Sequence, residues 1–174
     1  MRFKYFFGAI ASNVYRLLRV FPNSDPLMGF IVPASKSEAW WKAPLFAFAT
    51  MFTFDLITRF GTWTWVTAST YALIALALHS VLKNRKSTLK LFMGAGALGI
   101  LAFDFITGPL MISFIDGKSF WTTLVLQVPF TAMHLVSGVF YIIIISPFLD
   151  KEIMKEVSAL IHSAKGIVKA MVAA

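Results

Sequence analysis

The fold is decided by a five-residue stretch that the chain uses twice, as FDLIT at residues 54–58 and as FDFIT at residues 103–107. Each copy closes a long apolar run, and a turn-forming glycine follows shortly afterwards. A Trp-Thr pair then opens the next apolar run. The repeat therefore indicates two helical hairpins of the same design, at residues 43–82 and 89–148.

The composition is that of a membrane protein. Hydrophobic residues make up 58% of the chain and charged residues 14%, whereas soluble domains have about 45–50% and about 25%. A soluble chain of this composition would expose large apolar patches. We therefore expect an all-α integral membrane protein. The absence of cysteine excludes disulfides and thiolate metal sites.

The apolar runs predict a compact bundle of six transmembrane helices, since about 20 apolar residues cross a bilayer. The runs cover residues 3–20, 27–34, 43–58, 62–82, 89–111 and 120–148, and the second is short. We assign residues 1–149 to this single membrane domain. Residues 150–174 alternate charged with apolar residues, so we expect a cytoplasmic amphipathic helix there.

The positive charge predicts the orientation. The net charge of +8 comes from short loops and chain ends, which argues against a nucleic-acid partner. With the N-terminus in the cytoplasm, six spans put twelve of the 16 Lys and Arg residues on the cytoplasmic side, as the positive-inside rule requires. These twelve are Arg2, Lys4, Lys36, Lys42, Lys83, Arg85, Lys86, Lys90, Lys151, Lys155, Lys165 and Lys169. We expect a multi-pass protein of the cell membrane with both termini in the cytoplasm.

This orientation puts Asp55 and Asp104 at equal depth, near the external ends of two parallel helices. An acid within apolar sequence is costly unless it is paired, hydrated or functional. Asp55 has Arg59 four residues later, so an ion pair at the helix end is the alternative to a role in a site. Asp104 has no basic residue within a turn. Asp104 is therefore the stronger candidate for contact with a ligand.

Most other polar residues that packing does not explain fall in the same external half or in the last span. They are Asn23, Asp25, Thr58, Trp63, Trp65, Thr107, Gln127 and His134. Acids, hydroxyls, an amide and indole rings suit a small ligand that is partly aromatic or cationic. The alternatives are backbone bonding by the threonines, an interfacial role for the tryptophans and a structural bond from His134.

No pattern typical of an enzyme is present. The sequence contains no nucleophile elbow, no P-loop and no His-x-x-x-His pair. The stretch GAGALG at residues 94–99 matches a dinucleotide loop superficially, but it lies within a hydrophobic span, where close helix packing explains it. We therefore expect neither an enzyme nor a cofactor or metal site.

Three features together resemble the substrate-binding S components of energy-coupling-factor (ECF) vitamin transporters. They are FPNSDP at residues 21–26, the six-segment plan and GTWT at residues 61–64. In that family a stretch with proline and asparagine follows the first helix, and Gly-x-Trp-Thr opens the fourth. The resemblance covers residues 5–148. It implies a subunit that binds a small vitamin-like nutrient from outside and helps to import it.

The resemblance also implies partners. S components work with a transmembrane coupling subunit and two cytoplasmic ATPases, and they dock through small residues on the first helix. Here the nearest match is Gly8 with Ser12, although packing within the same chain is the alternative. The ligand site implied by the resemblance comprises Asn23, Asp25, Trp63, Trp65, Asp104, Thr107 and Gln127.

Two other functions fit the same sequence. In a proton-coupled secondary transporter, Asp55, Asp104 and His134 would carry protons. In a non-transporting membrane scaffold, the C-terminal amphipathic helix would recruit a partner. Dependence of uptake on a proton gradient or on ATP separates the two kinds of transporter.

Overall fold

The computed structural model describes residues 3–19 and 24–173, with the side chains of the last helix described as far as Lys165. The described residues form helices and no strand. The helices are α1 (Phe3–Leu18), α2 (Leu27–Ser37), α3 (Lys42–Thr58), α4 (Thr62–Leu82), α5 (Leu89–Phe105), the π-helical turn η1 (Ile106–Leu110), α6 (Met111–Asp116), α7 (Phe120–Leu149) and α8 (Lys151–Ala173). The prediction of an all-α protein is confirmed for this part of the chain.

Among the residues that the structure describes, three helical stretches are long and apolar enough to cross a membrane. They are Thr62–Leu82, Leu89–Asp116 and Phe120–Leu149. The helices α1, α2 and α3 have 16, 11 and 17 residues, whereas about 20 residues of helix cross a bilayer in the upright direction. The expected membrane character is therefore supported by three helices, and the crossing of six segments stays a prediction.

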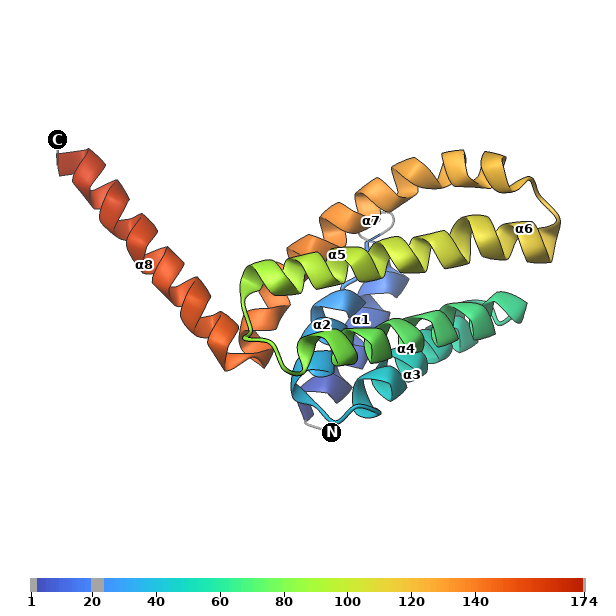
Figure 1. Cartoon of the computed structure of the whole chain (residues 1–174), viewed down its shortest axis with the longest axis horizontal. Helices are drawn as coiled ribbons and strands as arrows, with labels where there is room; N and C mark the ends of the chain where they lie inside the picture. The colour runs from blue at the N-terminus through green and yellow to red at the C-terminus, as the bar shows by residue number, and fades with distance from the viewer. Residues whose placement is uncertain (1–2, 20–23, 174) are drawn as a thin grey trace.

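The long helices form two antiparallel hairpins. Figure 1 shows α3 beside α4, and the continuous stretch from α5 to α6 beside α7. The turn of the first hairpin follows residues 54–58, and η1 and α6 extend the second hairpin beyond residues 103–107. Proline lacks an amide hydrogen and cannot complete the α-helical ladder. Pro109 therefore explains why the helix changes to a π-helical turn at this point.

The short helix α2 lies at the centre of the bundle. It contacts α1, α3, α4, α5 and α7, and eight of its 11 residues are buried. Gly29 permits the close approach of α7, because a Cβ atom there would lie 2.8 Å from the carbonyl oxygen of Tyr141. An interior helix does not have to match the thickness of the bilayer, which accounts for the short second apolar run.

One end of the bundle is fixed by polar contacts between chain segments far apart in sequence. Lys4 Nζ donates to the carbonyl of Phe148 at 2.8 Å, and Lys36 Nζ donates to the carbonyl of Lys83 at 3.2 Å. The start of α1 and the ends of α2, α4 and α7 therefore share this end. From there α8 leads away from the other helices (Figure 1), and Ile153 in its first turn is fully buried.

We predict that Gly29→Ala destabilises the protein by about 1–3 kcal/mol, because the added methyl group overpacks the contact between α2 and α7. The measurement is thermal unfolding of the purified protein in detergent. Gly94→Ala is the matched control, since a Cβ atom at Gly94 meets no atom within 4 Å. Equal stability of the two variants would contradict this account of the packing.

Candidate functional site

The carboxylate of Asp25 joins three parts of the bundle. Its Oδ1 atom accepts a hydrogen bond from the amide of Leu27 at 2.9 Å, at the start of α2. Its Oδ2 atom accepts from the hydroxyl of Tyr71 on α4 at 2.8 Å. Asp25 is 8% exposed and Tyr71 is fully buried. Both carboxylate oxygens have donors, as a buried charge requires.

The structure brings Asp104 on α5 together with His134 on α7. Asp104 Oδ1 lies 2.8 Å from His134 Nδ1, and the two residues are only 1% and 4% exposed. His134 is thus the partner that Asp104 lacks within its own helix. A structural bond is one alternative for His134, and His134 does form such a bond. Its partner is Asp104, which the sequence favours over Asp55 for contact with a ligand.

The other polar atom of each residue has no partner. Asp104 Oδ2 and His134 Nε2 are buried and form no hydrogen bond. The rings of Phe103 and Phe130 stand nearly perpendicular to the imidazole, with centroids 6.1 and 6.4 Å away. A buried polar group without a partner costs about 1–3 kcal/mol. The Asp104–His134 pair therefore has unused capacity for hydrogen bonds in an apolar setting.

Arg16 supplies an unpaired cation on the inner side of α1. Its guanidinium lies 3.9 Å from the centroid of the Phe54 ring and 2.7 Å from the Met51 sulfur. In the described part of the chain it forms no ion pair with a carboxylate. The adjacent residue, Tyr15, has its hydroxyl 2.8 Å from that of Ser24, the residue before Asp25. This arginine therefore belongs to the same polar region.

We call Arg16, Asp25, Tyr71, Asp104 and His134 the interior polar cluster. Phe103 lies between its two halves, since its ring centroid is 4.1 Å from that of Tyr71 and 6.1 Å from that of His134. No motif marks Arg16 or Tyr71 in the sequence. Only spacing indicates that Arg16 points into the bundle, because Arg16 lies on the same helix face as residues 5, 8 and 12, which are buried.

Asp55 does not form the ion pair with Arg59 that its spacing suggests. Its Oδ2 atom accepts a hydrogen bond from the hydroxyl of Thr67 on α4 at 3.3 Å. The amide of Arg59 still bonds to the carbonyl of Asp55 at 2.9 Å. However, α3 ends at Thr58 and Arg59 itself has extended backbone angles, so its side chain leaves the backbone in a different direction from that of a helical residue. The Arg59 guanidinium lies 5.5 Å from the centroid of the Trp63 ring instead.

The two threonines of the repeated stretch bond to their own helices. Thr58 Oγ1 donates to the carbonyl of Phe54 at 2.9 Å, and Thr107 Oγ1 donates to the carbonyl of Phe103 at 2.8 Å. This is the backbone-bonding alternative, in which a threonine satisfies its hydroxyl one turn back. Asn23, a further candidate, lies outside the described residues.

The two tryptophans differ in exposure. Trp63 is half-buried beneath Arg59. Trp65 is 53% exposed, and its ring packs against Phe52 at a centroid distance of 5.2 Å and against Phe60 at 6.2 Å. Trp65 therefore belongs to an aromatic group on the outer surface of the first hairpin.

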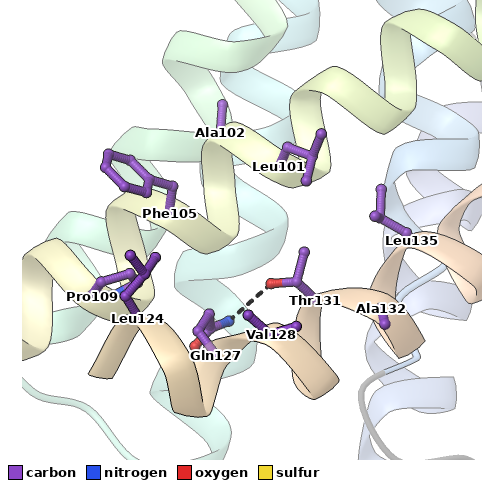
Figure 2. Close-up of a pocket in the computed structure, with 10 residues that line it drawn as sticks. All are labelled: Leu101, Ala102, Phe105, Pro109, Leu124, Gln127, Val128, Thr131, Ala132 and Leu135. Carbon is purple, nitrogen blue, oxygen red and sulfur yellow. Dashed lines mark hydrogen bonds between the residues drawn. The ribbon is translucent and has the colours of Figure 1, made fainter. Parts of the chain in front are cut away.

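Gln127 lines a groove between the two arms of the second hairpin (Figure 2). The groove has a volume of about 650 Å³ and is almost entirely apolar. Gln127 Nε2 donates to Thr131 Oγ1 at 3.5 Å, the outer limit of a hydrogen bond. Leu101 and Val128 in its wall are 45% and 63% exposed. The groove is thus open to the surroundings of the bundle, where lipid chains suit its walls.

Gly8 and Ser12 face the inside of the bundle. A Cβ atom at Gly8 would lie 2.6 Å from the ring of Phe30 on α2, and Ser12 is fully buried. The outward face of α1 carries large apolar side chains instead, among them Phe6 and Phe7, each 60% exposed. These two small residues therefore pack within the same chain, which is the alternative to docking that the sequence left open.

Comparisons with protein-family models, with curated proteins and with solved structures find no match to the chain. Within the described residues, no three His, Cys, Asp or Glu side chains gather as metal ligands would. The interior polar cluster is therefore the feature of this chain that bears on its function.

We predict that Tyr71→Phe lowers the free energy of unfolding by about 1–3 kcal/mol, because it leaves Asp25 Oδ2 buried without a donor. Thermal unfolding in detergent measures the change. Tyr141→Phe makes the same chemical change at a half-buried ring, whose hydroxyl accepts from Ser24 at 3.5 Å. Its effect should be smaller than about 1 kcal/mol. If both variants lost the same free energy of unfolding, the hydrogen bond to Asp25 would not contribute more to stability than the bond of Tyr141.

Proposed function

We propose that this chain is a membrane substrate-binding subunit for the uptake of a small vitamin-like nutrient, similar to the S component of an ECF transporter. The observation that carries the proposal is the buried Asp104–His134 pair with two polar atoms left unbonded. Buried ionisable residues within a membrane bundle are costly and usually mark a path or site for a ligand or ion. A bound molecule that supplies the missing hydrogen bonds would offset that cost.

The surroundings of the pair suit a small polar ligand with a flat ring. Asp104 Oδ2 is an acceptor, and His134 Nε2 accepts or donates according to its protonation state. Arg16 offers a guanidinium that contacts Met51 and Phe54 and, among the described residues, forms no ion pair. The ring of Phe103 gives an aromatic face between the two halves of the cluster. A few directed polar groups among aromatic walls are typical of small-molecule sites.

The proposal includes a six-helix bundle in the cell membrane, with both termini in the cytoplasm. In this arrangement α1 and α3 cross beside the three longer helices, and α2 occupies the interior. The end that holds Lys4, Lys36 and Lys83 faces the cytoplasm, in line with the positive-inside rule. A transmembrane coupling subunit and two ATPases would then drive import.

Proton-coupled secondary transport is the second candidate, and the same pair favours it. A buried aspartate bonded to a histidine is a common form of proton relay in transporters. Uptake that stops when the proton gradient is dissipated, while ATP is plentiful, would select this function. Uptake that stops when ATP is depleted would select the ECF-like function. Recovery of a partner through α8 without any uptake would instead indicate a scaffold.

We predict that a small molecule co-purifies with the extracted protein and that Asp104→Asn and His134→Gln each weaken its binding at least about tenfold, since each loses a buried hydrogen bond to a charged group. Mass spectrometry identifies the compound, and calorimetry with that compound measures the affinity.

Asp116→Asn is the matched control, because it makes the same change at an exposed aspartate. The control should bind as the unaltered protein does. Thermal unfolding of each variant shows whether the fold is kept. Unchanged affinity in both site variants would overturn the proposed site.

A further inference from the structure

A cluster of cations surrounds the place where α8 leaves the bundle. It is formed by the connection between α4 and α5, the first turn of α5 and the start of α8. Its members, which we call the basic collar, are Lys83, Arg85, Lys86, Lys90, Lys151 and Lys155, and all of them are exposed.

The acids of this region bond to backbone amides and a hydroxyl, and in the described residues they form no ion pair with the collar. Asp150 Oδ1 accepts from the amides of Glu152 and Ile153 at 2.9 and 3.2 Å. Asp150 Oδ2 accepts from the hydroxyl of Ser87 at 2.8 Å. Glu156 Oε2 accepts from the amide of Leu89 at 2.8 Å. Both carboxylates thus hold the starts of helices, where negative charge is favoured.

The collar is consequently a patch of excess positive charge. Within the described part of the chain, none of its cations forms an ion pair with a carboxylate. Glu152 is a third acid beside them and is exposed. Six cations therefore outnumber the three carboxylates of Asp150, Glu152 and Glu156, and such an excess attracts an anionic partner.

The backbone that carries the collar is held in place. The bonds from Ser87 to Asp150 and from Leu89 to Glu156 tie the connection to α8. Lys36 Nζ caps the end of α4 through the carbonyls of Lys83 and Arg85. A ligand therefore does not have to order this backbone when it binds, which lowers the entropic cost of binding.

We propose that the basic collar binds the phosphate groups of anionic phospholipids on the cytoplasmic side. The collar lies where the apolar stretches Thr62–Leu82, Leu89–Asp116 and Phe120–Leu149 begin or end. Lipid headgroups occupy this depth, and anionic ones attract basic segments next to spans. The start of α8 also exposes Met154, Leu160 and Ile161 between its charges. A lipid surface accepts both the charged and the apolar side chains of such a helix, whereas a nucleic acid accepts only the charged ones.

The test uses native mass spectrometry of the full-length protein with phosphatidylglycerol and phosphatidylcholine at equal concentration. We expect phosphatidylglycerol to bind at least about tenfold more tightly, because only its headgroup has net negative charge. Lys83→Gln/Arg85→Gln/Lys86→Gln should remove this preference. Lys151→Gln/Lys155→Gln should reduce it while leaving the connection unaltered.

The matched control is Arg19→Gln/Lys118→Gln, which removes two exposed cations outside the collar. It should keep the preference for phosphatidylglycerol. Equal binding of the two lipids, or loss of the preference in the control as well, would overturn the proposal. Binding of inorganic phosphate or of a short DNA duplex as tightly as phosphatidylglycerol would also overturn it, since the ligand would then not be a lipid.

Discussion

The bundle depends on a carboxylate that has hydrogen-bond donors at both oxygens. Asp25 receives the first amide of α2 and the hydroxyl of Tyr71, so it fixes the start of the central helix against α4. Because α2 contacts α1, α3, α4, α5 and α7, its position sets the position of all of them. A buried carboxylate that loses a hydrogen-bond donor is costly, which makes this bond a constraint on the whole fold.

Asp104 differs from Asp25 because its hydrogen bonding is incomplete. It is as deeply buried as any acid in the described residues, yet only one of its oxygens is bonded, to an imidazole that also has an unbonded nitrogen. Asp25 has hydrogen-bond donors at both oxygens and holds α2 against α4. The unbonded oxygen of Asp104 is what supports the proposal that Asp104 binds a ligand or a proton. Asp25 and Asp104 have the same side chain but differ in how many of its oxygens are hydrogen-bonded.

The apolar and the charged surfaces of the bundle are separate, as a membrane protein requires. The middle of the molecule exposes apolar side chains, such as Leu98 and Val136 at 69% and 75% exposure. Six of the lysines and arginines gather where the connection between α4 and α5 meets the start of α8. They outnumber the three acids beside them, Asp150, Glu152 and Glu156, so this end has excess positive charge.

The sequence by itself determined the helical class and, to within one residue, the boundaries of the helices Thr62–Leu82 and Phe120–Leu149, because periodicity and hydropathy are local properties of the chain. It singled out Asp104 as a candidate, because the cost of a buried acid is also a local property. It ended the run that begins at residue 89 at residue 111, whereas the helical stretch continues to Asp116. It did not show that His134 is the partner of Asp104, that Tyr71 is the partner of Asp25, or that Arg16 turns inward. It also suggested an Asp55–Arg59 pair that the end of α3 prevents. Only the tertiary structure decided these points, since hydrogen bonds between helices depend on how the helices are rotated and packed, and residues 30 or 46 positions apart carry no local signal of their contact.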